Sequence, residues 1–319
     1  MGKVFTVRTL PLVAVIILTS VLALPCAGAV TIAYPRDGNW PTAFLDVNGD
    51  GISDLVMEID PWNVKRASGF QRMTYDPESG RVEFVSNLSD EVLVDPESWV
   101  HGYPEVYFGT KPWNGNSAPG FGVELPVKVS EMRHFLVHVE YSINLTDPIP
   151  FNLAMETWLT KEKNRSTGVF PGEAEIMVWL YYSNLTPAGE KIGEAHVPLL
   201  VNGSLVNATF EVWLDGNMGD GWQYMAFMIA EPMREADVTL DPTLFVTAAE
   251  NFSRVDLKNL YLQDWEMGTE FGGPDTREAH FRWVMEGINA RYGSLKDLFP
   301  TAILRVIPLF ARMRCILPL

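Results

Sequence analysis

Short runs of β-branched and aromatic residues alternate with turn-forming residues from residue 30 to about residue 292. Runs of this kind, bounded by Gly, Pro, Asn and Asp, are typical of β-strands. The helical spacing of Leu244, Ala248 and Phe252 predicts one short helix over residues 242–255. The pattern therefore predicts an all-β fold, a β-jelly roll sandwich of two antiparallel sheets. The clearest predicted strands cover residues 82–85, 135–141, 175–182, 196–201, 209–214 and 224–230.

The predicted strand that begins at Glu175 has two chemically different sides. Alternate residues of a strand face the same way. Glu175, Met177 and Trp179 therefore form a side with a carboxylate, a thioether and an indole, whereas Ile176 and Val178 face a core. Carboxylates and tryptophans on one side of a sheet are the chemistry of a site that cleaves sugars. The preceding strand repeats the pattern, and its polar side carries Asn152, Glu156 and Trp158.

These two strands are predicted to form a hairpin over residues 151–180, with a polar loop at residues 161–172. If the strands pair about a centre near Arg165 and Ser166, Glu156 lies opposite Glu175. Two carboxylates so placed do not both ionise freely, so one of them keeps a proton or the two share it. We expect such a pair to orient and tune a nucleophilic carboxylate.

A third acid, Glu270, follows Gly268 in a segment rich in aromatic residues and glycine. A carboxylic acid against an aromatic surface keeps its proton to higher pH and can act as a general acid. Glycoside hydrolysis needs this combination, with one carboxylate that attacks and one acid that protonates the leaving oxygen. In a chain with 40 acidic residues, the alternative for any single glutamate is an ordinary surface acid.

Two tryptophans lie in loop-like stretches, Asp60-Pro-Trp62 and Lys111-Pro-Trp113, where flat aromatic platforms for sugars occur. We expect Trp62 to be such a platform. Trp113 is either a platform or a core residue, because the two kinds of tryptophan have the same sequence signature. Trp213 and Trp283 are expected in the core.

The segment Asp46-Val-Asn48-Gly-Asp50-Gly-Ile52-Ser-Asp54 resembles the first half of a calcium-binding loop. Oxygen-bearing side chains stand at alternate positions, and glycine permits a sharp turn. Ile52 would bind through its carbonyl oxygen, and the other four through their side chains. Met57 stands at the twelfth position, where a complete EF-hand has Glu. The sequence thus predicts a structural Ca²⁺, the alternative being an ordinary acidic glycine turn.

Both ends of the chain differ from the domain, which we place at residues 30–293. Residues 1–29 combine a basic start, an apolar run and a small-residue cleavage site, and we predict a secretory signal peptide there. A membrane anchor and lipid modification of Cys26 are the alternatives. Residues 294–319 are apolar and carry three arginines, which fits either a poorly ordered tail or attachment to a membrane surface.

The composition limits the partners of the chain. Cleavage after Ala29 removes two basic residues and no acidic ones, so the formal net charge moves from −16 to −18. Such a surface does not suit nucleic acid and is compatible with a neutral polymer. The only cysteines are Cys26 and Cys315, so no internal disulfide survives processing. We expect a secreted, extracellular monomer.

Several motifs, in the same order, resemble the endoglucanases of glycoside hydrolase family 12, above all those of hyperthermophilic archaea and bacteria. The resemblance covers about residues 31–287. The motifs that carry it are Trp62-Asn-Val, Gly102-Tyr-Pro-Glu-Val-Tyr107, Lys111-Pro-Trp113, Asn152-Leu-Ala-Met-Glu156-Thr-Trp-Leu, Glu175-Ile-Met-Val-Trp-Leu180 and Gly268-Thr-Glu270-Phe-Gly.

The resemblance implies a jelly roll with a long concave substrate cleft, Glu175 as the nucleophile and Glu270 as the general acid and base. It implies that Glu156, where most members have Asp, is hydrogen-bonded to the nucleophile. The implied activity is that of a secreted endo-β-1,4-glucanase acting with retention on cellulose-type or mixed-linkage β-glucans, with no cofactor for catalysis. A preference for xyloglucan and a non-catalytic glucan-binding role are the alternatives, and the intact carboxylate pair argues against the second. The positions implied near the cleaved bond are Asn152, Met177 and Trp179.

Overall fold

The computed structural model describes residues 28–98 and 100–298. All but the last two residues of the predicted signal peptide lie outside the described residues, and so does the predicted tail beyond residue 298. Within the described part, no helix combines the length and the apolar character needed to cross a membrane.

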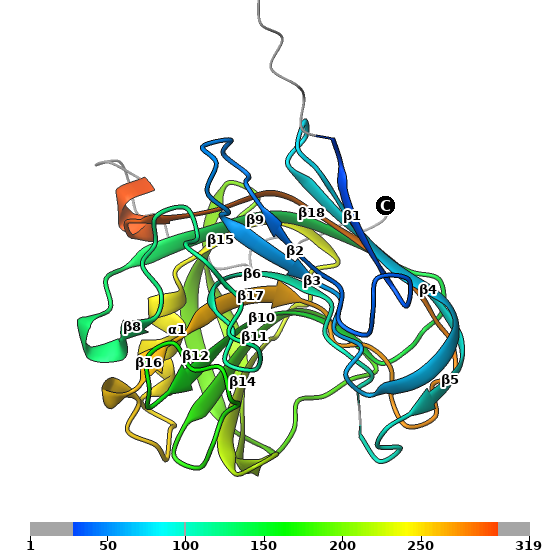
Figure 1. Cartoon of the computed structure of the whole chain (residues 1–319). Helices are drawn as coiled ribbons and strands as arrows, with labels where there is room; N and C mark the ends of the chain where they lie inside the picture. Colours follow the sequence, from blue (N-terminus) through cyan, green and yellow to red (C-terminus); the bar gives the residue numbers. More distant parts are fainter. Residues whose placement is uncertain (1–27, 99, 299–319) are drawn as a thin grey trace, which may run out of the picture.

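Strands of the described residues form two layers, and the long strands of the outer layer curve around the inner layer (Figure 1). The inner layer, which carries the predicted site, has the order β2 (Thr42–Leu45), β3 (Leu55–Glu58), β6 (Glu105–Thr110), β17 (Asp264–Gly268), β10 (Phe151–Thr160), β11 (Ala174–Ser183), β14 (Trp222–Ile229) and β13 (Ser204–Met218). The outer layer has the order β1 (Val30–Tyr34), β4 (Val64–Asp76), β5 (Arg81–Leu93), β18 (Ala279–Tyr292), β9 (Phe135–Leu145), β15 (Glu235–Leu240) and β12 (Glu190–Val201).

The two layers are joined through β12, which pairs with β13 as well as with β15. The parallel pair is β11 with β14, and the other strand pairs in the described ranges run antiparallel. The predicted all-β jelly roll is confirmed, with this one parallel pair added. The short elements are β7 (Ser117–Ala118), β8 (Val127–Lys128), β16 (Tyr261–Leu262), α1 (Pro242–Ala249) and the 3-10 turns η1 (Val129–Glu131), η2 (Leu257–Asn259) and η3 (Leu295–Leu298).

The main core lies between the layers and is built from alternate residues of each strand. Met155 of β10 and Ile176 and Val178 of β11 point into it, as the alternation predicts. The opposite face of these strands is also covered, because every residue of β6, β10 and β17 is buried. Close packing on both faces holds the side chains of the inner layer in fixed positions.

The hairpin of β10 and β11 has a different register from the one predicted. Glu156 lies opposite Met177, and Glu175 lies opposite Trp158. A shift of two residues keeps each side chain on its predicted face and changes only its partner. The loop sets this register, because the Glu173 carboxylate accepts the N–H groups of Lys161 and Phe170 at 2.7 and 2.8 Å. Glu156 and Glu175 are therefore diagonal rather than direct neighbours.

The helix α1 ends at Ala249, six residues before the predicted end at Val255. Asp241 caps its first turn by accepting the N–H of Thr243 at 3.0 Å. After the helix, the buried Gln223 binds the chain: its amide donates to the Ser253 hydroxyl, and its carbonyl accepts the N–H of Arg254. This long-range contact turns the chain away from the helix axis, and local spacing does not reveal it.

Phe245→Ala is expected to lower the free energy of unfolding by about 3–5 kcal/mol, because it leaves a cavity in the core. The buried Phe245 ring packs edge to face with Phe210 and Phe227, at centroid distances of 5.2 and 5.5 Å. Thr247→Ala, on the exposed side of the same helix, is the control and should change stability by about 0.5 kcal/mol or less. Chemical denaturation measures both variants, and equal losses would contradict the packing described.

Candidate active site

The inner layer gathers carboxyl groups on the face opposite the main core, called here the carboxylate face. Alternation on three adjacent strands places Glu266 of β17, Glu156 of β10 and Glu175 of β11 on this face. Their exposed fractions are 1%, 5% and 7%. Burial disfavours the charged form of a carboxyl group, so these acids hold their protons to higher pH than acids in water.

Glu175 accepts a hydrogen bond from the indole N–H of Trp222, with 2.8 Å between Nε1 and Oε2. Burial raises the pKa of Glu175 to about 8, the Trp222 hydrogen bond opposes this rise, and the charge of Glu270 adds to it. The indole N–H stabilises the carboxylate form and fixes one of its oxygens. The other carboxylate oxygen, Oε1, accepts no bond from Trp222 and is available to react.

Glu270 follows the end of β17 and is held on both sides by Asn152 of β10. The side-chain NH₂ of Asn152 donates to the Glu270 carboxylate. The backbone N–H of Glu270 donates to the side-chain oxygen of Asn152 at 2.8 Å. The Asn152 N–H also donates to the Glu270 backbone carbonyl at 3.0 Å. Burial raises the pKa of Glu270 to about 7, and the Asn152 hydrogen bond lowers it in part. The partly exposed Glu270 is therefore a carboxyl group that changes protonation near neutral pH.

Glu156 lies among the other acids of the site. Burial raises its pKa well above the usual range, and the charges of Glu175, Glu266, Glu105 and Glu270 raise it further. Burial therefore favours the protonated form of Glu156, which can donate a hydrogen bond to a neighbouring carboxylate. This is the property expected of a residue that shares a proton with Glu175.

Three tryptophans pack edge to face beside Glu175. Trp113 lies 5.1 Å from Trp158 and 5.6 Å from Trp222, and Trp158 lies 5.8 Å from Trp222, measured between ring centroids. Trp113 is 40% exposed, so it presents a free indole surface next to the acids, and Trp62 is 44% exposed. Sequence reasoning missed Trp222, because its contact with Glu175 depends on the parallel pairing of β14 with β11.

Met177 and Trp179 lie on the carboxylate face as predicted, but each is only 1% exposed. The Trp179 indole N–H points at the Met177 sulfur, 3.5 Å away. Both residues pack in a second apolar cluster with Tyr103 and Tyr224. They therefore support the site by packing beside it. Trp213 was expected in the core and is instead half-buried against this second cluster, whereas Trp283 is fully buried in the core.

The predicted calcium loop connects β2 and β3. The Asp46 carboxylate accepts the backbone N–H groups of Gly49, Asp50 and Gly51 at 2.7–3.2 Å. The side-chain oxygen of Asn48 accepts the Asp50 N–H at 2.9 Å. These bonds close a tight turn, and two of them end on the same oxygen, Asp46 Oδ1, and occupy both of its lone pairs. Ile52 is 57% exposed, and Asp54 is 3% exposed.

A second group of acids surrounds the ammonium of Lys111. Glu58, Asp60 and Glu105 have carboxylate oxygens close enough together to hold a metal ion. Lys111 Nζ contacts all three, lying 3.4 Å from Glu58, 3.6 Å from Asp60 and directly against Glu105. The ammonium already supplies the positive charge at this position, so the group is an ion-pair cluster and is no candidate metal centre.

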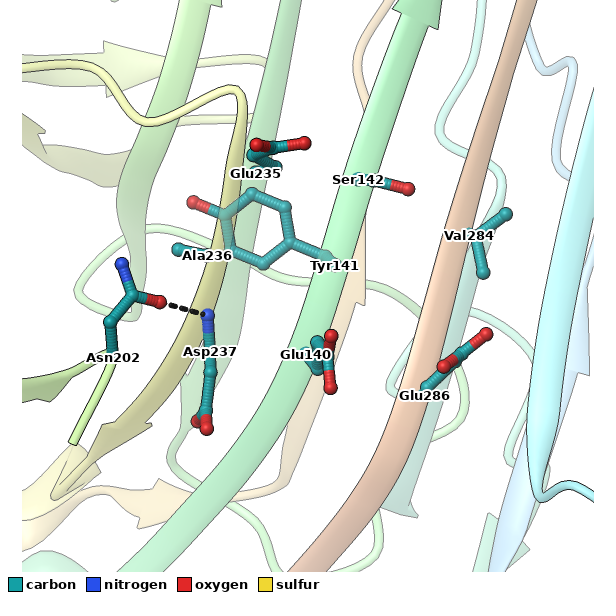
Figure 2. Close-up of a pocket in the computed structure, with 9 residues that line it drawn as sticks. All are labelled: Glu140, Tyr141, Ser142, Asn202, Glu235, Ala236, Asp237, Val284 and Glu286. Carbon is teal, nitrogen blue, oxygen red and sulfur yellow. Dashed lines mark hydrogen bonds between the residues drawn. The ribbon is translucent and has the colours of Figure 1, made fainter.

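The outer layer carries a hollow on its solvent side, lined by strands other than those that carry Glu156, Glu175 and Glu266 (Figure 2). No tryptophan lines it, and the Tyr141 hydroxyl is engaged with the Met233 carbonyl at 3.0 Å. Its acids are exposed or half-buried, whereas Glu175, Glu156 and Glu266 are buried. The hollow therefore has neither the buried acids of the carboxylate face nor the tryptophans beside Glu175. The acids that line the hollow are Glu140, Glu235, Asp237 and Glu286.

Comparison with known proteins gives one family and one fold. The family model described as Glycosyl hydrolase family 12 matches residues 53–289. A metagenome-derived glycoside hydrolase family 12 endoglucanase has 20% identity and a TM-score of 0.61, with 83% of this chain and 98% of that chain covered. The endoglucanase Cel12A from Rhodothermus marinus has 21% identity and a TM-score of 0.61, with 83% of this chain and 100% of that chain covered. A native family 12 xyloglucanase from Bacillus licheniformis has 20% identity and a TM-score of 0.62, with 83% of this chain and 100% of that chain covered. No curated protein matches the chain.

Trp222→Phe is expected to raise the pKa of Glu175, because it keeps the ring and removes the N–H that stabilises the carboxylate. A rise of about one unit would leave about tenfold less Glu175 ionised at pH 7, so kcat/KM on a soluble β-glucan should fall about tenfold there. Trp158→Phe is the matched control, since the Trp158 indole N–H has no acceptor. A Trp222→Phe protein with the same kcat/KM as the Trp158→Phe protein at pH 7 would contradict the role of this hydrogen bond.

Proposed function

Because the chain belongs to glycosyl hydrolase family 12, we propose that it is an endo-acting β-1,4-glucanase that hydrolyses internal bonds of β-glucans with retention of configuration. The observation that carries this proposal is the pair of desolvated acids, Glu175 and Glu270, with pKa values raised to about 8 and about 7. A binding protein has no need of two such acids. The test is the release of reducing ends from a soluble β-glucan.

The proposed reaction is a double displacement. The Glu175 carboxylate attacks the anomeric carbon and forms a glycosyl ester, while Glu270 gives its proton to the departing oxygen. Glu270 then takes a proton from water, and the oxygen of that water attacks the ester and releases the sugar. Asn152 orients Glu270 throughout, because it binds both the side chain and the backbone of that residue.

The protonation of the site sets its working pH. The reactive form needs Glu175 ionised and Glu270 protonated. With pKa values of about 8 and about 7, this form is a minority of the free protein and is most populated between these two pH values. The hydrogen bond from Trp222 stabilises the ionised form of Glu175 and so increases the population of the reactive form. The raised pKa of Glu156 favours the reactive form too, since a protonated Glu156 adds no negative charge beside Glu175.

The substrate we propose is a cellulose-type or mixed-linkage glucan. Trp62 and Trp113 are exposed and offer flat apolar surfaces of the kind on which sugar rings stack. A preference for xyloglucan is the second candidate, supported by the similarity to the Bacillus licheniformis xyloglucanase. Digestion of a panel of glucans, with product lengths measured, separates the two candidates.

We further propose a secreted, thermostable monomer of the hyperthermophilic archaeal type. The basic and apolar pattern of residues 1–29 supports export, and the acidic composition supports solubility outside the cell. The motifs quoted above support the archaeal type. The tail at residues 294–319 is given no role in catalysis, because all site residues precede it.

A structural Ca²⁺ in the loop at residues 46–54 is also proposed. The residue types suit the ion, since Asp46, Asn48 and Asp50 offer hard oxygen ligands around a tight glycine turn, although the ion would compete with the backbone N–H groups that these oxygens accept. Asp54 would close one side, and its carboxylate already accepts the N–H of Val47 at 2.9 Å. The Ile52 carbonyl is the fifth ligand proposed. The ion would tie β2 to β3 and would take no part in the reaction.

Glu175→Gln should reduce turnover of a soluble β-glucan by several orders of magnitude while glucan binding persists, because the shape stays and the nucleophile is lost. Glu270→Gln should also be severe on glucans. It should be milder on an aryl glycoside whose leaving group needs no proton. Steady-state kinetics on both substrates and a binding assay measure these effects.

The control for these substitutions is Glu194→Gln, the same chemical change at an exposed residue of β12. Its turnover should match that of the unmodified protein. Near-normal turnover by Glu175→Gln, or a first product of α configuration, would rule out the mechanism proposed.

A chelator should lower the melting temperature while leaving activity at moderate temperature nearly unchanged. An ion that binds only the native state adds stability in proportion to the logarithm of its concentration over its dissociation constant. Asp46→Ala should lower the melting temperature to a similar degree, and chelator should then have no further effect. Asp275→Ala, in another exposed turn, is the control. Identical melting curves with and without chelator would remove the calcium proposal.

A further inference from the structure

Further acids lie on the carboxylate face without a role in the reaction described so far. Glu105 of β6 and Asp264 and Glu266 of β17 are 0%, 0% and 1% exposed. A fully buried acid without a partner is rare, because the loss of hydration is costly. Their position relative to Glu156 indicates what they do.

Strand register places Glu266 directly beside Glu156. Glu266 lies opposite Glu156 on one side and opposite Tyr107 on the other. Directly opposed residues of an antiparallel pair have Cβ atoms about 4.5–5.5 Å apart, so the carboxyl groups of Glu156 and Glu266 are immediate neighbours. Tyr107 lies between Glu266 and β3, where it is opposite Val56. The acids thus follow one line across the strands, from the nucleophile toward β6.

Glu105 extends this line by one more carboxyl group. It lies opposite Gly268, and a Cβ at Gly268 would stand 2.8 Å from the Glu105 Cβ. Glycine at this position therefore gives Glu105 the room to lean toward Glu266, and the two carboxyl groups are hydrogen-bonded to each other. Glu266 is also hydrogen-bonded to Asp264.

A hydrogen bond between two carboxyl groups requires a proton on one of them. Three buried oxygens on these residues have no N–H or hydroxyl donor, namely Glu105 Oε2, Glu266 Oε1 and Asp264 Oδ2. Carboxyl protons are the donors that remain to satisfy them. The three acids therefore hold protons between them, as a connected group.

The end of the line at β6 is fixed by Lys111. Its ammonium contacts Glu105, and it also pairs with Glu58 and Asp60. Glu58 is further bound by the Tyr107 hydroxyl at 3.3 Å and by the Asn114 amide at 3.1 Å. Negative charge is thus stabilised at the Lys111 end, and the proton is displaced toward the Glu156 end.

We propose that Glu266 and Glu105 are positioning residues, a buried carboxyl relay that runs from Lys111 to Glu156 and keeps on Glu156 the proton that it shares with the nucleophile Glu175. The proposal rests on the proposed function, because it assigns the relay a part in that reaction. Neither residue touches the substrate in this role. They act through Glu156.

The charges around Glu156 agree in direction with this role. After burial and Glu175, the charges of Glu266 and then Glu105 raise the pKa of Glu156. Burial alone would lower the pKa of Lys111, but Glu105, Glu266, Glu58 and Asp60 raise it well above the usual value, so it stays charged. The titratable and charged groups that face Glu156 or Glu266 are Glu105, Glu175, Asp264, Glu270, Lys111, Tyr103, Tyr107 and Tyr224.

The test compares Glu266→Gln and Glu105→Gln with the unmodified protein. Gln keeps the shape and removes the share of the group's negative charge that this acid carries, so Glu156 should lose its proton at lower pH. We expect a downward shift of about 1 pH unit for Glu266→Gln and a smaller one for Glu105→Gln. Carbon-13 NMR titration of the glutamate carboxyls, with the Glu156 signal assigned from Glu156→Gln, measures the shift. The alkaline limb of the kcat/KM profile on soluble β-glucan should move the same way.

Asp241→Asn is the matched control, because it is also a buried acid changed to its amide and Asn still caps α1. It should leave both the Glu156 titration and the alkaline limb in place. Melting temperatures are recorded for all variants, and if Glu266→Gln does not fold, Glu105→Gln decides the question by the same two readouts.

An unchanged Glu156 titration in both relay variants overturns the proposal. A titration that moves while the alkaline limb stays in place overturns it too, because the proton on Glu156 would then have no part in the reaction. If the unmodified protein releases no reducing ends from any β-glucan, the proposed function fails, and the NMR titration still decides whether the relay holds the proton on Glu156.

Discussion

Burial of carboxyl groups on one face of a packed sheet is the constraint on which the rest of this structure depends. Glu105, Glu156, Glu175 and Glu266 are at most 7% exposed. An ionised carboxylate in such a place loses its hydration, and the protein must offer hydrogen bonds, a counter-charge or a proton instead. Each of these solutions is found at a different acid, and the differences between them make a chemically useful site.

The positions of the acids are set by the opposite face of the same strands. Met155, Ile176 and Val178 are fixed in the main core, so the residues between them have no freedom to turn away from one another. Trp222 supplies a hydrogen bond to Glu175, Asn152 supplies one to Glu270, and Lys111 supplies a charge to Glu105. Glu156 receives none of these, and its pKa is raised, which favours its protonated form. The order of ionisation therefore follows from which partner each strand brings.

The sequence predicts a large part of this arrangement, because alternation on a strand is a local property. It correctly assigned Glu156 and Glu175 to one face and Ile176 and Val178 to the other. It did not predict the partner of Glu156, since the register depends on how Glu173 closes the loop. The end of α1 was missed for a similar reason, because Gln223 binds the chain there from a distant strand.

The acids missed by sequence reasoning show where alternation stops being informative. Glu266 stands between Trp265 and Met267, which both face the core, so its face was open to prediction. The role of Glu266 could not be predicted, because that role depends on β17 lying between β10 and β6, two strands far from Glu266 in the sequence. The contact of Trp222 with Glu175 depends in the same way on the parallel pairing of β11 with β14. A local pattern predicts which side chains share a face of one strand, whereas the order of the strands decides which charged groups become neighbours. In this site the neighbouring charged groups determine which acid holds the proton.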